Sequence, residues 1–294
     1  MLITWGYRVR NSIMERIDPR ARWIFSLAFL FAVTMFWDAR YLLFFFVLGF
    51  GWYFLANVPW RETRRAWTLV SIILFTMIVV NTILTGGGAG GIVPPGGHLV
   101  WPDGFTIPIL GWTIEFGLTY ERIWFAVCQV LRITSISAVF IIIPFSMDPR
   151  LYGVTFKGLG FPDKLAYTME LAFRYVPTLA RDFNITFDAQ KARGYELERM
   201  GGSLFQQLTR IAPLIVPVTM NSILTGEDVT NAMDLRCFGT HRRTWLVKLK
   251  YVWADYLLIA FSALLLVGSF FITTVLGLGG FTVPSWFLSL FGIA

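Results

Sequence analysis

Long apolar runs alternate with short, arginine-rich connections over most of this chain. A helix needs about 20 apolar residues to cross the roughly 30 Å hydrocarbon core of a bilayer. Five runs reach or approach that length, at residues 23–37, 41–58, 67–84, 118–143 and 251–276. The pattern therefore predicts an all-α polytopic membrane protein with about five transmembrane helices.

The first apolar run, residues 23–37, is the shortest of the five. Three arrangements accommodate it: a tilted helix, a span in a thinned part of the membrane, or a shallow hairpin formed with the second run across Asp38-Ala39-Arg40. In each arrangement the chain returns to the side from which it started.

Residues 163–194 have the period of an amphipathic surface helix. Apolar side chains recur three and four positions apart, which places them on one face, at Phe173, Val176, Ala180, Phe183 and Phe187. We expect this helix to end at Ala192-Arg193-Gly194, because glycine favours a left-handed terminator and arginine complements the negative end of the helix dipole.

A second amphipathic helix is expected to begin near Ser203, with apolar positions at Leu208, Ile211 and Ile215. The sequence predicts an interruption at Thr225-Gly226, followed by a new first turn that the acids Glu227 and Asp228 would favour. The segment ends in a second arginine sequence, made of Leu235, Arg236, Cys237, Phe238 and Gly239.

Internal prolines are a further property that the two amphipathic segments share. Pro177 lies in the first segment, and Pro213 and Pro217 lie in the second. Proline removes a helical hydrogen bond and clashes with the preceding turn, so we expect bent or segmented helices rather than straight rods.

The distribution of basic residues predicts the orientation in the membrane, because arginine and lysine are held on the cytoplasmic side during insertion. Five arginines precede residue 23, three lie in 61–65 and fourteen basic residues lie in 144–250, whereas 86–117 contains none. We therefore expect a cytoplasmic N-terminus, an extracellular loop at 86–117 and an extracellular C-terminus. Three regions follow: residues 1–143 with the first four spans, 144–250 with cytoplasmic helices, and 251–294 with the last span and tail.

Composition agrees with a membrane protein and excludes several classes of site. Hydrophobic residues make up 56% of the chain and charged residues 15%, against about a quarter charged in soluble domains. The net charge of +7 is explained by topology, so no nucleic-acid partner is expected. His98 and His241 fall on opposite sides of the membrane, and Cys128 and Cys237 are not expected to pair, so neither a metal site nor a disulfide is predicted.

The glycine-rich stretch 86–97 resembles a phosphate-binding loop only superficially. Such a loop ends in Gly-Lys-Ser or Gly-Lys-Thr, whose lysine and hydroxyl reach phosphate and magnesium, and none is present. We interpret 86–97 as an irregular extracellular loop. No metalloprotease, nucleophile-elbow or paired-carboxylate pattern occurs elsewhere, so we expect no catalytic residues and no cofactor.

Together these sequences resemble the transmembrane (T) component of energy-coupling factor (ECF) transporters, the CbiQ-like family. Residues 17–22, Ile-Asp-Pro-Arg-Ala-Arg, are similar to the family's Asp-Pro-Arg leader, and 158–162 with 174–177 are similar to its Gly-x-Pro turn and aromatic-proline helix. Residues 189–194 match its first Ala-Arg-Gly signature. The second match is looser, since Leu235 replaces the usual alanine and Cys237 the usual glycine.

The resemblance implies a non-catalytic scaffold of an ATP-driven importer of a vitamin or other micronutrient in a prokaryotic plasma membrane. Its partners would be two cytoplasmic ATPases, which bind the ATP, and a membrane-embedded substrate-binding S component. ATPase docking is implied for Ala192, Arg193, Gly194, Leu235, Arg236, Cys237, Phe238 and Gly239. We assign the S-component or coupling surface to Phe173, Phe183, Phe187, Leu208, Ile211 and Ile215.

Three alternatives stay open from the sequence. Arg193 and Arg236 also fit ordinary surface arginines that complete helix ends. Arg132 lies within the span 118–143, where a charge costs about 2.5–3.5 kcal/mol, and it either braces the bundle or lines a substrate path. A secondary transporter or channel is the rival function, although it would usually show internal repeats and broken polar spans, which are not evident here.

Overall fold

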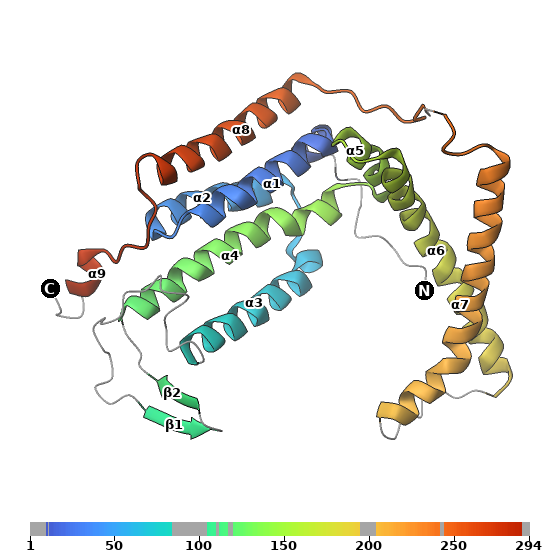
Figure 1. Cartoon of the computed structure of the whole chain (residues 1–294), viewed down its shortest axis with the longest axis horizontal. Helices are drawn as coiled ribbons and strands as arrows, with labels where there is room; N and C mark the ends of the chain where they lie inside the picture. Colours follow the sequence, from blue (N-terminus) through green and yellow to red (C-terminus); the bar gives the residue numbers. More distant parts are fainter. Residues whose placement is uncertain are drawn as a thin grey trace. The chain divides into compact units, whose positions relative to one another are not determined.

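The computed structural model describes residues 10, 12–83, 105–109, 112–116, 120–194, 204–241 and 244–289. It divides into two compact units (Figure 1). One contains residues 148–249, and the other contains the described parts of 6–147 and 250–294. We describe each unit by itself.

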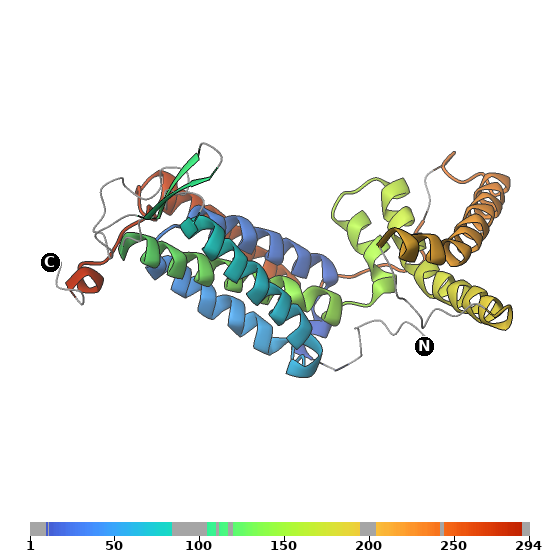
Figure 2. The same cartoon turned by 90° about the horizontal axis from the view of Figure 1, so that it is seen from below.

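The larger unit is a bundle of helices that correspond to the five predicted apolar runs. The helices lie alongside one another in both views (Figure 1 and Figure 2), and they are α1 (Pro19–Met35), α2 (Ala39–Leu55), α3 (Trp60–Ile83), α4 (Tyr120–Ser146) and α8 (Trp253–Thr274). Helix α4 packs against α2 and α3, and α1 packs against α8. The all-α membrane class predicted from the pattern is confirmed.

Within the described residues, three helices are long and apolar enough to cross a membrane: Trp60–Val80, Tyr120–Ser146 and Trp253–Thr274. Helix α2 is apolar but shorter. Helices α1 and α2 have 17 residues each and form a hairpin, joined by residues 36–38. Asp18 and Asp38 begin these two helices, each accepting a hydrogen bond from the backbone N–H two residues later.

Aromatic rings form the core of the bundle. Phe25 packs on Trp52 with ring centroids 4.3 Å apart, and Phe29 meets Phe45 edge to face at 5.6 Å, which fixes α1 against α2. Gly49 lets α2 approach α4, because a Cβ there would lie 3.0 Å from the Ser135 carbonyl oxygen. Helices α2 and α4 are therefore closely packed, and their crossing needs a small residue at this position.

The smaller unit is built on two long helices. A 3-10 turn (Pro149–Leu151) and α5 (Tyr152–Gly158) precede α6 (Asp163–Ala192), and α7 (Leu204–Leu235) follows. The predicted end of α6 at Ala192 is confirmed. The predicted interruption at Thr225-Gly226 is wrong, because α7 runs through it; glycine costs only about 1 kcal/mol inside a helix.

Proline shapes α7 and also helps to join it to α6. Helix α7 is bent, as expected for a helix that contains Pro213 and Pro217 (Figure 1). Pro217 has no N–H to donate to the carbonyl of Pro213, four residues earlier. The Gln190 side chain donates to that carbonyl instead, at 3.2 Å. The Pro213 carbonyl, which Pro217 leaves without a helical donor, therefore accepts a hydrogen bond that joins the two helices.

Two strands, β1 (Phe105–Ile109) and β2 (Trp112–Phe116), pair antiparallel in the segment expected to be an extracellular loop, with Phe105 opposite Phe116. This ribbon was not predicted from the sequence, and the glycine-rich stretch 86–97 lies outside the described residues. Near the other end of the chain, a segment leading to α9 (Ser285–Ser289) packs on the α1–α2 turn, where the Trp37 N–H donates to the Gly279 carbonyl at 2.7 Å.

Candidate functional site

The two arginine sequences fold into the same helix terminator. At the end of α6 the Arg193 N–H donates to the Gln190 carbonyl at 3.1 Å, and the Gly194 N–H to Lys191 at 2.9 Å. At the end of α7 the corresponding bonds run from Arg236 to Met233 at 3.1 Å and from Cys237 to Asp234 at 2.9 Å. The hydrogen-bond pattern repeats although the residues around the arginines differ.

The residue after each arginine adopts the left-handed conformation. Gly194 has a φ of +84° and Cys237 a φ of +52°. Cys237 therefore occupies a backbone position at which glycine is favoured, and for a residue with a Cβ this conformation costs about 1–2 kcal/mol. The turn closes with a third bond, from the Phe238 N–H to the Met233 carbonyl at 3.0 Å. The cysteine preserves the terminator rather than abolishing it.

The two terminators lie at opposite ends of an antiparallel helix pair. Asn221 on α7 donates to Asp182 on α6 at 3.3 Å, and the Phe238 ring lies 4.7 Å from Tyr167 near the start of α6. Arg236 is therefore beside the beginning of α6, whereas Arg193 is at its other end. Helix α6 has 30 residues, so about 45 Å of helix lies between these ends at 1.5 Å per residue.

The side chains at both ends face solvent in this chain alone. Ala192, Arg193 and Gly194 are exposed, as are Arg236, Cys237 and Gly239, while Phe238 is half-buried. Leu235 is 87% exposed, which is unusual for a leucine. Beside the first end, the Lys191 ammonium lies 4.4 Å from the centre of the Phe187 ring. Each end thus presents cationic groups next to apolar surface.

A hollow of about 760 Å³ adjoins the second terminator. It is lined by residues of the α6 start and by residues within 233–241 and 244–246, among them Arg236, Phe238 and His241. The Trp245 indole N–H donates to the Asp163 carboxylate at 3.2 Å, and Lys157 pairs with that carboxylate at 2.9 Å. These bonds, that from Lys157 foremost, hold the pKa of Asp163 below its usual value. No local pattern indicates this arrangement, since Asp163 and Trp245 are 82 residues apart.

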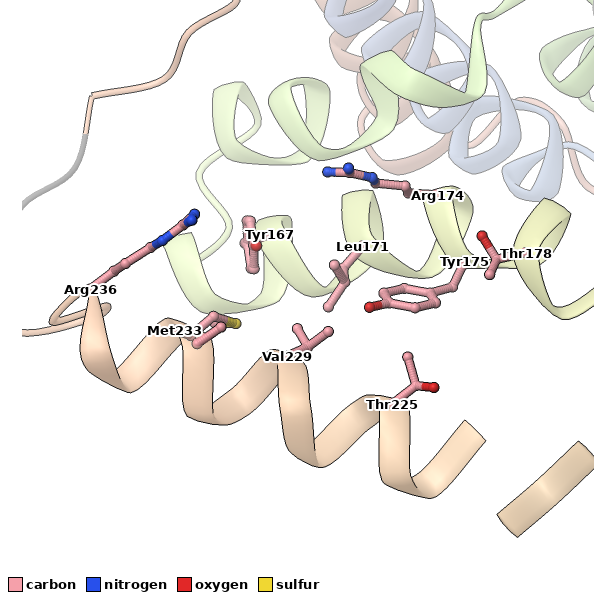
Figure 3. A pocket seen from close by; sticks show the side chains of 10 residues that line it. Tyr167, Leu171, Arg174, Tyr175, Thr178, Thr225, Val229, Met233 and Arg236 are labelled. Atoms are coloured by element: carbon pink, nitrogen blue, oxygen red, sulfur yellow. The ribbon is translucent and has the colours of Figure 1, made fainter. Parts of the chain in front are cut away.

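A second hollow of about 420 Å³ lies between α6 and α7 (Figure 3). Leu171 and Tyr175 of α6 face Val229 and Thr225 of α7 across it, and Arg236 extends along one end. The two helices therefore leave a groove between them instead of closing on one another along this stretch. Arginine, tyrosine and threonine groups make this groove partly polar.

The residues assigned to a coupling surface differ in their surroundings where the structure describes their side chains. Phe173 stacks on Tyr152 of α5 with centroids 4.6 Å apart, whereas Phe183 and Phe187 stack on each other at 6.4 Å. Phe183 is 44% exposed and Ile215 is 51% exposed. Leu208 and Ile211 lie on α7, but their side chains fall outside the described part of the chain.

Arg132 is buried in the bundle and contacts the α1–α2 turn. Its guanidinium donates to the Phe36 carbonyl and, at 3.3 Å, to the Gln129 side chain, and it lies 3.9 Å from the centre of the Trp37 ring. Phe36 is the C-cap of α1, where carbonyls lack helical partners and a positive charge is favourable. These contacts favour the bracing interpretation over a substrate path.

Comparisons with known proteins agree with this architecture. The family model described as CbiQ, cobalt transport protein, matches residues 10–246. Proteins named energy-coupling factor transporter transmembrane protein EcfT are similar over nearly their whole length. The protein from Thermosediminibacter oceani is 25% identical over 91% of this chain and 96% of its own length, and that from Bacillus selenitireducens is 28% identical over 88% and 94%.

Proposed function

The chain belongs to the CbiQ family and is an EcfT-like transmembrane component of an ECF transporter; we propose that it is the scaffold through which two cytoplasmic ATPases act on a membrane-embedded substrate-binding component. In this proposal the complex imports a vitamin or other micronutrient across a prokaryotic plasma membrane. The scaffold binds no ATP, because the ATPases hold it.

The observation that carries the proposal is the repeated helix terminator. Arg193 and Arg236 each lie in a turn with the same hydrogen-bond pattern. The two turns are at opposite ends of one helix pair. A repeated element on one chain suits two copies of one kind of partner, or two similar partners. Arginine can form two parallel hydrogen bonds with a carboxylate, so an acidic groove on each ATPase is the complementary surface.

The second partner would bind the exposed apolar faces of the same helices. Phe183 and Ile215 are about half exposed in the chain alone, and the helices that carry them also have many charged residues. An S component embedded in the membrane has apolar surface with which such faces can be buried. We assign the ATPases to the helix ends and the S component to these faces.

Movement of the ATPases would then reach the S component through α6 and α7. Within the described residues, hydrogen bonds from Gln190 and Asn221 join the helices, and a groove of about 420 Å³ lies between them, so a change in their crossing requires little repacking. ATP binding and hydrolysis would shift one helix end relative to the other. The bound S component would tip between outward-facing and inward-facing states.

Docking of cytoplasmic ATPases requires 148–249 to face the cytoplasm, and cysteine labelling tests this orientation. Cys237 is exposed, so it is first replaced by alanine, while buried Cys128 stays. A cysteine at Gly96 should react with an impermeant thiol reagent in intact cells, and one at Ser203 only after the membrane is opened. The opposite result would place the helix pair outside and exclude the ATPase partners.

Pull-down of the ATPases with Arg193→Glu/Arg236→Glu is the direct test of docking. Reversing a charge at a desolvated contact costs about 2–5 kcal/mol, so the double variant should lose both ATPases. Arg181→Glu is the matched control, since Arg181 is an exposed arginine within α6 and away from its ends. The docking role is wrong if the double variant keeps its ATPases as well as the control does.

A further inference from the structure

The leader sequence Asp18-Pro19-Arg20-Ala21-Arg22 contacts both places where the chain passes between the two units. The chain leaves the bundle after Met147 and returns to it at Lys250. Asp18 and Arg22 are 6% and 7% exposed, which is unusual for charged side chains. Their contacts account for this burial and link them to α4 and α8.

On the outgoing side, arginines bind the last carbonyls of α4. The Arg22 guanidinium donates to the Ser146 carbonyl at 2.8 Å and to the Ser146 hydroxyl at 3.1 Å. Arg10 donates to the Phe145 carbonyl at 3.2 Å. Carbonyls in the last turn of a helix lack helical donors and carry partial negative charge, so these cations stabilise the end of α4.

On the returning side, a buried carboxylate joins the starts of α8 and α1. Asp255, 1% exposed, accepts the N–H of Asp18 at 2.7 Å through one oxygen and the N–H of Val252 at 2.6 Å through the other. Arg20, paired with Asp18 at 2.8 Å, lies 3.9 Å from the centre of the Tyr251 ring. The returning chain is thus fixed at the same turn of α1 as the outgoing chain.

We propose that Asp18, Arg22 and Asp255 are positioning residues that hold the end of α4 and the start of α8 on one turn of α1, and we call these three residues and their contacts the joint. One helical turn of α1 holds both connections. Movement of the helix pair therefore displaces α1, α4 and α8 together, instead of only bending the connecting peptides. The joint determines how much transport each ATP hydrolysed produces. This inference rests on the proposed function, since it supplies the route by which ATPase movement reaches the bundle.

Nearly isosteric substitutions weaken the hydrogen bonds of the joint but keep side chains of similar size in place. Asp255→Asn leaves one acceptor oxygen for two backbone N–H groups, so one of the two bonds is lost. Arg22→Lys keeps the positive charge but replaces a planar fork by a single ammonium. Ser146→Ala removes only the hydroxyl acceptor and keeps the carbonyl contact. Arg16→Lys is the matched control, because Arg16 is exposed and lies two residues before the leader sequence.

The test measures substrate uptake and ATP hydrolysis on the same proteoliposomes containing the full complex. We expect Asp255→Asn and Arg22→Lys to retain their ATPases and to lower uptake per ATP hydrolysed at least tenfold, Ser146→Ala to lower it two- to threefold, and Arg16→Lys to leave it unchanged. A variant that merely unfolds a fraction of the protein lowers both activities together and leaves the ratio unchanged.

An unchanged ratio in Asp255→Asn and Arg22→Lys would overturn the proposal. If those two variants fail to assemble, an unchanged ratio in Ser146→Ala would overturn it as well. Loss of ATPases from the wild-type chain would instead contradict the proposed function. Pull-down on the same samples separates that failure from failure of the joint.

Discussion

The bundle and the helix pair α6–α7 differ in how much of their apolar surface they bury on their own. The bundle encloses a continuous core that includes Phe25, Phe29 and Phe36, each at most 2% exposed. Among the side chains described on α6 and α7, only Ala166 and Leu214 are buried. The bundle is held together by its own packing, whereas the described part of the helix pair has almost no buried core.

Exposed apolar residues have a different meaning in the two regions. On the bundle, Phe75 and Leu264 are 70% and 72% exposed on apolar helices, where lipid would cover them. On the helix pair, Ile185 and Val216 are 67% and 57% exposed on amphipathic helices whose other positions are polar or charged. Large exposed apolar patches mark interaction sites. This contrast supports the proposal that partner proteins cover the apolar surface of the helix pair.

The largest predicted effect comes from the bundle core. Phe29→Ala removes a fully buried ring that packs on Phe25 and Phe45, and it should lower the free energy of unfolding by about 3–5 kcal/mol. The matched change Phe183→Ala, at a 44% exposed ring on α6, should cost less than about 1 kcal/mol in the isolated chain. Denaturant unfolding in detergent measures both, and equal losses would remove the contrast between the two regions.

The next effect appears only when partners are present. Phe183→Asp and Ile215→Asp place a charge where we expect the S component to bind, which would bury that charge unpaired. The variants should fold and hydrolyse ATP with bound ATPases, but lose the S component and nutrient uptake. Co-purification of all subunits provides the measurement. Normal uptake at normal protein level would show that these faces are ordinary helix surface.

A smaller effect is predicted at the two terminators. Gly194→Ala should destabilise the end of α6 by about 1 kcal/mol, because φ there is +84°. Cys237→Ala should change little, since both residues carry a Cβ at the left-handed position, whereas Cys237→Gly should relieve strain. Amide hydrogen exchange at the ends of α6 and α7 reports these changes. Faster exchange after Cys237→Gly than after Cys237→Ala would contradict the shared geometry.

The smallest effect concerns acid titration of Asp163. The pKa of Asp163 is lowered in the folded chain by its bonds to Lys157 and Trp245. These bonds therefore stabilise the fold fully above the ordinary aspartate pKa of about 3.9, and this stabilisation is lost as pH falls through the lower folded pKa. The indole N–H resonance of Trp245, assigned by its absence in Trp245→Phe, should shift with a midpoint below that ordinary pKa. A midpoint at or above it, or the same titration in Asp163→Asn, would show that the pair does not form.

Local features of the fold were predictable from the sequence. Apolar length located the five bundle helices, and the glycine after Arg193 marked the end of α6, because both signals depend on neighbouring residues. The β-ribbon had a readable signal that was not used: 105–109 and 112–116 are rich in β-branched and aromatic residues and are separated by two residues that end in glycine. The interruption predicted at Thr225-Gly226 gave too much weight to one glycine.

Contacts between distant residues were not predictable in the same way. Asp255 accepts a bond from Asp18, 237 residues away, and as a single acid at the start of an apolar run it carries no pattern of its own. The left-handed turn at Cys237 was also hidden, since cysteine rarely adopts it. Such features depend on tertiary packing, which periodicity and local propensity do not specify.

The number of ATPases bound per chain tests the central claim most directly, namely that each arginine end holds one ATPase. Native mass spectrometry of the purified complex should count two ATPases for the wild type and one for Arg193→Glu or Arg236→Glu alone. The Arg181→Glu control should keep two. Retention of both ATPases by each single variant would contradict the claim that the two matched helix ends are separate docking sites.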